Sequence, residues 1–271
     1  MADEDVKPST VPEEEEGGPV KSFLEHLEDL RWVLIRVIAS IGLGMAACMV
    51  AAPLLVEIII LPLTVSGVEI DLDLFGPIGG IVVMMKIALW GGLTLALPFV
   101  LFFIAQFVMP ALKKTERVYF RRAFIIGGGL FVIGALMAYA LILPISLKGL
   151  VQVNEWMGLP TKTWRAEEYF QFAIMFMVGM GLSLEIPVVI LTLVRIGVIP
   201  YELLIKGRVY FFIGNMVLCA FITPDAVSTI FMVVPVQVLM EICIIIARGW
   251  EKKRRIAEAA TLKLGNQNLA D

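Results

Sequence analysis

The residues best placed for chemistry in this sequence are carboxylates that lie next to long apolar runs. Glu25, Glu28 and Asp29 occur together in the segment SFLEHLEDLR, and Glu116 is the only acid in the segment PALKKTERVYFRR, which carries five basic residues. Because a guanidinium makes bidentate, charge-assisted hydrogen bonds to a carboxylate, two such acidic groups close together could bind a ligand with paired arginines. The alternative is that Glu116 pairs with a basic neighbour in its own segment and that the other acids are only solvated.

Three further charged residues fall inside apolar runs, where an ionisable group is costly and usually faces the protein interior or water. Glu185 is ten residues from Arg195, or about 15 Å along a helix. It is either a polar contact for another membrane segment, a proton or ion site, or a protonated glutamate that is hydrogen-bonded inside the bundle. The aliphatic part of the Lys86 side chain is long enough for its ammonium group to reach the outer interface of the membrane. Glu241 is expected to form a local ion pair or an interfacial contact.

Signatures of enzymes and of metal or cofactor sites are missing from the sequence. It has no Walker A motif, and its single histidine, His26, excludes the H-E-x-x-H zinc motif. Ser183 lies in GLSL rather than in a G-x-S-x-G elbow, and the three cysteines lack the spacing of metal ligands. We therefore expect no catalysis, no cofactor, no bound metal and no nucleic-acid partner.

The elements that must position these side chains are apolar runs long enough to cross a membrane. The 271 residues are 59% hydrophobic and 17% charged, against about 45–50% and about 25% in soluble domains. The apolar residues gather in runs of roughly 20, the length that crosses about 30 Å of hydrocarbon. The sequence predicts an all-α membrane protein with six transmembrane helices, at residues 33–52, 78–107, 123–147, 169–194, 209–222 and 227–247. The fifth run has 14 residues, which is about 21 Å of helix and short for the hydrocarbon.

The segments outside the spans are interpreted from their composition. Residues 1–20 are acidic and rich in Pro and Gly, which predicts a disordered tail. Ser22 and Glu25 form a capping-box pattern, and Phe23, Leu27 and Leu30 recur at helical spacing, so we expect a short amphipathic helix at the membrane surface that runs into the first span. The membrane domain is expected to cover residues 21–250, with a frayed polar tail at 251–271, a connecting segment at 53–77, and loops at 148–168 and 195–208.

The basic residues are unevenly divided between the two sides of the predicted membrane. Eighteen Lys and Arg residues lie in the N-terminal segment, the second and fourth connections and the C-terminal tail, and three lie on the other side. Lys and Arg accumulate in cytoplasmic loops. Both chain ends are therefore predicted to be cytoplasmic, and both acidic groups lie on that side.

Four segments, taken in order, resemble TatC, the multispanning subunit of the twin-arginine protein translocase. They are SFLEHLEDLR before the first span, FVMPALKKTER after the second, GLSLEIP in the fourth, and ITPD leading to VVPVQVLMEI across the sixth. The resemblance covers about residues 22–250. It implies a receptor in the bacterial cytoplasmic (inner) membrane for signal peptides with two consecutive arginines, which are carried by proteins exported in the folded state. It also implies assembly with single-span TatA- and TatB-like subunits, a homo-oligomer within the complex, and transport driven by the proton-motive force.

The resemblance further implies roles for particular residues. Glu116 matches the family's recognition glutamate in the first cytoplasmic loop, and Asp29 matches the one in the first helix motif, where Glu28 is the alternative. The implied signal-peptide site comprises Glu28, Asp29, Arg31, Phe107, Pro110, Glu116 and Arg117. Glu185 matches the family's glutamate in the fourth span, and Asp225 is the best match to the aspartate of its periplasmic turn.

Two other functions are consistent with part of the distribution of charged residues. A secondary transporter or ion channel would use Glu185 and Lys86 as coupling charges, but no internal repeat is visible between the first three spans and the last three. A pure scaffold for other membrane subunits would tolerate substitution of the acidic cytoplasmic positions. The sequence therefore favours a receptor for exported proteins, with these two as alternatives.

Overall fold

The computed structural model describes residues 23–159, 162–223 and 225–267. In chain order, its elements are α1 (Phe23–Val50), α2 (Ala52–Ser66), β1 (Asp71–Asp73), α3 (Gly79–Lys86), η1 (Ile87–Gly91), α4 (Gly92–Val108), η2 (Met109–Ala111), α5 (Lys114–Met137), η3 (Ala138–Ile142), α6 (Leu143–Trp156), β2 (Thr163–Arg165), α7 (Ala166–Arg195), α8 (Tyr201–Lys206), α9 (Arg208–Ile222) and α10 (Ala226–Gln267). The π-helical segments η1 and η3 join their neighbours into continuous rods, and η2 is a single 3-10 turn. The chain is therefore a bundle of long helices with very little strand.

Five rods in the described part of the chain are long and apolar enough to cross a membrane. They are Glu25–Val50, Gly79–Val108, Glu116–Trp156, Ala166–Arg195 and Ala226–Ile256. The predicted multi-span helical membrane fold is thus confirmed. The short fifth span corresponds to α9, which has 15 residues, or about 22 Å; its crossing stays a prediction.

The connecting segment 53–77 and the two segments expected to be loops contain regular structure. The segment 53–77 contains most of α2, the segment 148–168 includes the end of α6 and β2, and the segment 195–208 contains α8. The two loop predictions were wrong where α6, β2 and α8 occur, because segments too short or too polar to cross a membrane were interpreted as irregular connections. A short helix can be stabilised by tertiary packing of one face, and Ile59 and Leu63 of α2 are buried in the core.

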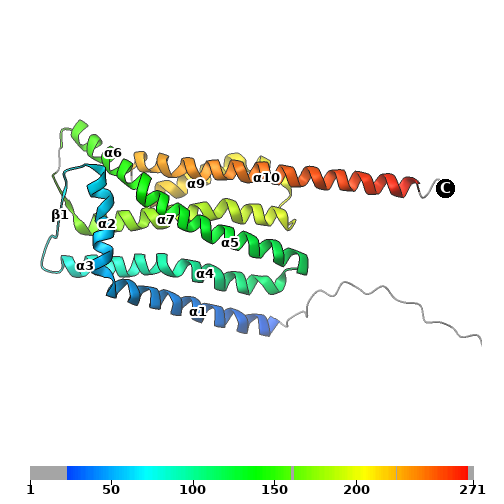
Figure 1. Cartoon of the computed structure of the whole chain (residues 1–271), viewed down its shortest axis with the longest axis horizontal. Helices are drawn as coiled ribbons and strands as arrows, with labels where there is room; N and C mark the ends of the chain where they lie inside the picture. The colour runs from blue at the N-terminus through cyan, green and yellow to red at the C-terminus, as the bar shows by residue number, and fades with distance from the viewer. Residues whose placement is uncertain (1–22, 160–161, 224, 268–271) are drawn as a thin grey trace, which may run out of the picture.

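One end of the bundle, which we call the strand end, is closed by α2 and a small parallel sheet. β1 pairs with β2 from Asp71↔Thr163 to Asp73↔Arg165, and α2 runs across the rods at this end (Figure 1). The hydroxyl of Tyr169 in α7 donates a 2.7 Å hydrogen bond to the carbonyl oxygen of Ile59 in α2. The all-α prediction missed this sheet, whose two strands lie far apart in the sequence.

The opposite end, which we call the tail end, holds the start of α1, the connection from α4 to α5, and the C-terminal part of α10 (Figure 1). The expected amphipathic segment forms the first turns of α1 and is continuous with its apolar part. α10 stays helical to Gln267, so residues 251–267 are not frayed as expected. A 2.9 Å pair between Arg255 Nε and Glu251 Oε1 supports this extension at helical i, i+4 spacing.

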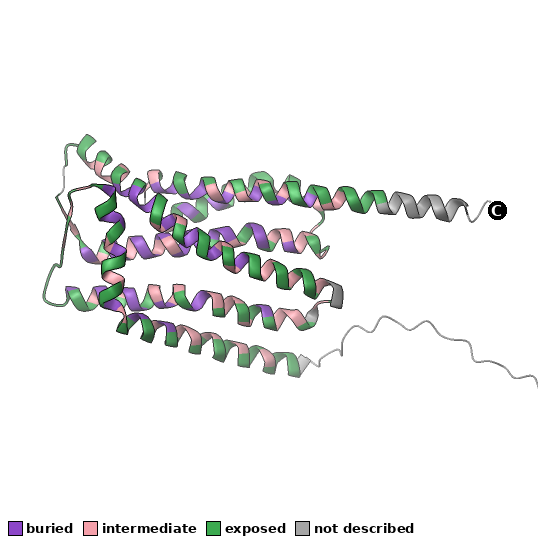
Figure 2. Ribbon diagram, viewed as in Figure 1, coloured by how far each residue is buried: buried purple, intermediate pink, exposed green. Residues whose placement is uncertain are grey.

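The helices pack as two groups. α1 packs along α4, whereas α7 packs along α5 and also contacts α9 and α10. Glycines allow the close approach in both groups: a Cβ at Gly44 would lie 2.5 Å from the carbonyl oxygen of Gly92, and one at Gly134 would lie 3.1 Å from the Cα of Gly181. Among the span-length rods α7 is the most buried and α1 the least, as the colours of Figure 2 show.

Candidate functional site

The first turns of α1 are fixed against the C-terminal end of α4 at the tail end. His26 stacks on Phe107, with ring centroids 4.5 Å apart and ring planes 24° apart. Further along α1, a terminal nitrogen of Arg36 donates a 3.4 Å hydrogen bond to Gln106 Oε1. From the sequence, His26 served only to exclude a zinc motif, and its stacking on Phe107 was not predicted. The one available signal was the position of His26 within the acidic segment that precedes the first span.

The stack between His26 and Phe107 decides which acid of α1 faces α4. Asp29 follows His26 by three residues and lies on nearly the same helix face, whereas Glu28, two residues on, points to the opposite side. The exposure of the side chains agrees, because Asp29 is partly buried and Glu28 is exposed. Arg31 is also exposed. Of the acids considered at this segment, Asp29 is thus directed toward the end of α4.

The connection from α4 to α5 is a turn held by hydrogen bonds. Pro110 lies in the 3-10 turn η2 that ends α4. From the first turns of α5, Arg117 donates through Nε to the carbonyl oxygen of Leu112 at 3.0 Å and through a terminal nitrogen to that of Pro110 at 3.2 Å. Two donors of this guanidinium are therefore engaged by the backbone of the loop, so Arg117 fixes the shape of the turn.

Glu116 is the N-terminal capping acid of α5. Its Oε2 accepts a 3.0 Å hydrogen bond from the backbone N–H of Lys113, which satisfies one of the free donors at the helix start. Within the described residues, this carboxylate makes no ion pair with Lys113, Arg117 or Arg121. The partly buried charge of Glu116 is therefore not neutralised by any of these three cations.

Asp29 and Glu116 lie at the same end of the bundle, on helices that both adjoin α4. α1 contacts α4, and α4 contacts α5. Phe107 lies at the first of these contacts and Pro110 lies in the turn that leads to the second. A cationic ligand that lies across the end of α4 could therefore meet both carboxylates, whereas Glu28 and Arg31 point more toward solvent.

Glu185 lies in the C-terminal half of α7, between the two groups of helices. It lines a groove of about 570 Å³ together with Trp90 and Phe221, and also a smaller one of about 220 Å³ together with Phe124. Its Oε2 lies against Gly127 of α5, with no room there for a Cβ. Its Oε1 is buried without a hydrogen-bond partner. Because unsatisfied buried polar groups are rare, this carboxyl is poised to interact with a polar group that enters either groove.

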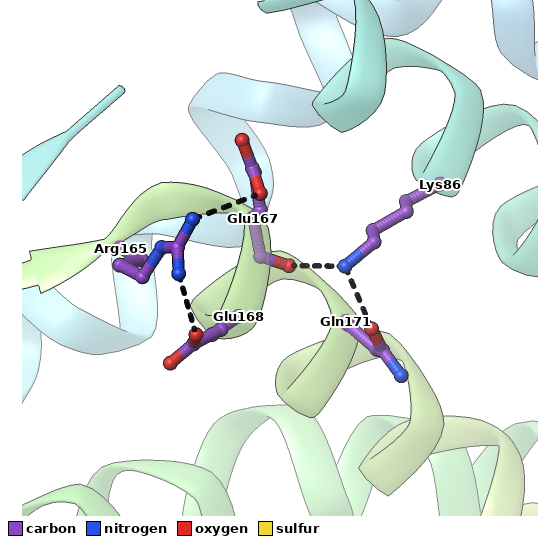
Figure 3. A network of polar contacts seen from close by, with 5 residues as sticks. All are labelled: Lys86, Arg165, Glu167, Glu168 and Gln171. Atoms are coloured by element: carbon purple, nitrogen blue, oxygen red, sulfur yellow. Dashed lines mark hydrogen bonds and ion pairs between the residues drawn. The ribbon is translucent and has the colours of Figure 1, made fainter. Parts of the chain in front are cut away.

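Lys86 is bound to the first turns of α7 at the strand end, as Figure 3 shows. Its ammonium donates to Gln171 Oε1 at 2.8 Å and to the carbonyl oxygen of Glu167 at 3.3 Å. Next to it, Arg165 lies 4.0 Å from a carboxylate oxygen of Glu167 and 3.7 Å from one of Glu168. The charge of Lys86 is therefore accommodated by polar groups at the end of the bundle rather than by a carboxylate inside it.

The two remaining predicted polar residues have local partners. Glu241 Oε1 lies 2.6 Å from Arg208 Nε and accepts a 3.1 Å hydrogen bond from Gln237, so α10 is linked to the start of α9. Asp225 precedes α10, and its Oδ2 accepts a 2.6 Å hydrogen bond from the backbone N–H of Ser228. This is the geometry of a helix N-cap, so Asp225 fixes the turn between α9 and α10.

Comparisons with known proteins agree on one family. The family described as Sec-independent protein translocase protein (TatC) matches residues 25–235. The TatC protein of Aquifex aeolicus (strain VF5) is 32% identical over 236 residues, covering 87% of this chain and 98% of the relative. The TatC protein of Carboxydothermus hydrogenoformans (strain Z-2901) is 32% identical over 235 residues, covering 86% and 95%.

The fold also matches a solved structure. A crystal structure of the twin-arginine translocase receptor TatC in the detergent DDM superposes with a TM-score of 0.74 and 32% identity, covering 82% of this chain and 99% of that one. The family match over residues 25–235 includes both Asp29 and Glu116.

Proposed function

This chain belongs to the TatC family of Sec-independent protein translocase components, and on that premise we propose that it is the receptor that binds twin-arginine signal peptides of folded precursor proteins. As a translocase component it is a transport subunit, not an enzyme. The observation that carries the proposal is the position of two carboxylates, Asp29 and Glu116, on the two helices that adjoin α4 at the tail end. Each could accept one guanidinium of a paired-arginine motif.

The neighbouring residues shape this binding site rather than add charge to it. Phe107 orients α1 through His26, and Arg117 holds the turn that begins at Pro110. Arg31 carries the same charge as the ligand and is exposed, so it is assigned to the periphery of the site. Recognition then depends on two carboxylates whose helices are held in position before the ligand binds. Preorganisation of this kind lowers the entropic cost of binding.

We assign the tail end to the cytoplasm and both chain ends to that side. The basic loops predicted to be cytoplasmic lie at the tail end, and the start of α1 and the end of α10 are found there together (Figure 1). The location that follows is the bacterial cytoplasmic membrane, with the strand end facing outward and α9 crossing as a short fifth span.

Glu185 is the proposed contact for single-span partner subunits of the TatA and TatB kind. The larger groove beside it is lined almost entirely by apolar side chains of α4, α7 and α9, which suits a membrane helix. A polar side chain on that helix would satisfy the free Oε1 of Glu185. The assembled complex, a homo-oligomer of this subunit with its partners, would use the proton-motive force for transport.

The transporter alternative is less well supported by the position of the charges. Lys86 is bound to Gln171, which lies 14 residues before Glu185 on the same helix, or about 21 Å away. The two charges proposed to act together as coupling groups are therefore in separate parts of the bundle.

The test is binding of a fluorescent signal peptide to the purified chain in detergent, with Arg–Arg compared against Lys–Lys. Arg–Arg should bind at least about tenfold more tightly, because only guanidinium makes bidentate contacts. Glu116→Gln should remove that preference while keeping the α5 cap, since glutamine also caps at this position; Glu116→Ala should remove both. Full Arg–Arg preference in folded Glu116→Gln would refute the proposal.

A further inference from the structure

A shallow groove runs between α1 and α4, and no other helix in the described part of the chain lines it. Its volume is about 500 Å³. On α1 it is lined by the small side chains of Ala39, Ser40 and Ala47, and on α4 by the rings of Phe99 and Phe103. The hydroxyl of Ser40 already donates to a backbone carbonyl of its own helix at 2.8 Å. The body of the groove is therefore apolar and open to the surroundings of the bundle.

A single cation, Arg36, lies at the tail-end limit of this groove. Its side chain is exposed, and its hydrogen bond to Gln106 is long at 3.4 Å, which leaves most of the five guanidinium donors available. Trp32, one helical turn earlier on α1, is 53% exposed. Exposed tryptophans are enriched where membrane helices meet the headgroup region. The cationic end of the groove therefore lies near the level of the lipid headgroups.

The length of the groove matches one leaflet of a bilayer. From Arg36 to Ala47 α1 advances eleven residues, which is about 16 Å, and half of a hydrocarbon core of about 30 Å is about 15 Å. We propose that this groove binds one anionic phospholipid of the tail-end leaflet, with its phosphate on Arg36 and an acyl chain along Ala39, Ser40 and Ala47. A membrane-spanning partner helix would extend beyond the groove into the other leaflet.

The experiment is native mass spectrometry of the purified full-length chain in detergent, titrated with phosphatidylglycerol or with phosphatidylcholine. The wild-type chain should bind a first phosphatidylglycerol about fivefold more tightly than phosphatidylcholine, the ratio expected for one basic residue at an anionic headgroup. Arg36→Gln should reduce this ratio to about one, and Arg36→Lys should restore most of it. Arg122→Gln, which removes an exposed cation at the same end but away from the groove, should leave it unchanged.

A second variant tests the acyl-chain part of the groove. Ala47→Phe places a ring at the far end of the groove and should weaken binding of both lipids about equally, without changing the headgroup preference. The proposal is overturned if the wild-type chain does not distinguish the lipids, if folded Arg36→Gln keeps the preference, or if Ala47→Phe binds like the wild type. If Ala47→Phe binds lipid like the wild type but co-purifies poorly with a single-span partner, the groove would be assigned to the membrane helix of that partner. None of these results bears on signal-peptide binding, which is measured separately.

Discussion

At the residue scale, Arg117 shows how a charged side chain of a proposed binding site can be engaged by the protein backbone. The family resemblance places it in the signal-peptide site, yet two of its donors are bound to the backbone carbonyls of Leu112 and Pro110. A guanidinium engaged in this way holds the loop that presents Glu116. Its positive charge would in any case repel an arginine ligand, so we infer a positioning role for Arg117.

The two acids of α1 should differ in their effect on signal-peptide binding. Asp29 shares a helix face with His26 and is partly buried, whereas Glu28 is exposed on the other side. Asp29→Asn should therefore weaken binding of the Arg–Arg peptide by about tenfold, equivalent to about 1.4 kcal/mol, and Glu28→Gln by less than about twofold. Fluorescence titration of both variants beside the wild type measures the difference. The opposite ranking would transfer the recognition role to Glu28.

At the element scale, the contact between α1 and α4 depends on two glycines rather than on interlocking large side chains. The backbone of α4 at Gly92 lies so close to α1 that a Cβ there would be 2.5 Å from the Cα of Met45. In a membrane, helices associate through close backbone packing, because lipid supplies no hydrophobic driving force between them. The position of the acidic segment of α1 therefore depends on Gly44 and Gly92 as well as on His26.

A matched pair of substitutions in α1 tests this dependence. Gly44→Ala should destabilise the protein by about 1–3 kcal/mol, as overpacking usually does, because its Cβ would meet the carbonyl oxygen of Gly92. Gly42→Ala, two residues earlier with open space around it, should be neutral or slightly stabilising, since alanine favours the helix. Thermal unfolding in detergent compares the two. Equal melting temperatures would mean that α1 shifts freely against α4.

At the scale of the whole molecule, the strand end and the tail end differ in charge and in construction. The strand end carries the exposed acids Glu57, Asp71 and Asp73 and is closed by α2 and the β1–β2 pair. The tail end carries the basic turn before α5 and the extended part of α10. The two groups of helices leave Glu185 exposed to the grooves between them. A partner that binds there would contact both groups at once.

The assignment of the tail end to the cytoplasm predicts a labelling pattern. Cys48, Cys219 and Cys243 are at most 6% exposed, so the wild-type chain should react little with a membrane-impermeant maleimide. Asp73→Cys at the strand end should be labelled in intact spheroplasts, and Lys252→Cys on α10 only in inverted vesicles. Labelling of Lys252→Cys from outside would reverse the orientation.

Much of the architecture could be predicted from the sequence, whereas the detail of the site could not. The long apolar runs, the short α9 and the acids at the tail end were all predicted from composition and spacing. The helix α2, the small sheet and the continuation of α10 were missed. In the site, the stack of His26 on Phe107 and the bonds from Arg117 to the loop were not anticipated, because neither follows a periodic pattern.

The hydropathy of the chain was sufficient to identify a multi-span helical membrane protein, since a run of about 20 apolar residues crosses the hydrocarbon whatever its neighbours are. It also determined which acids and bases lie near the ends of the spans. The packing of the helices was needed to show that Asp29 faces α4 while Glu28 does not. It was also needed to show that Lys86 is bound to Gln171 and that Glu185 lines the grooves between the two groups of helices. Crossing a membrane depends on local hydrophobicity, whereas the partner of each polar side chain depends on which helices pack together and at what rotation.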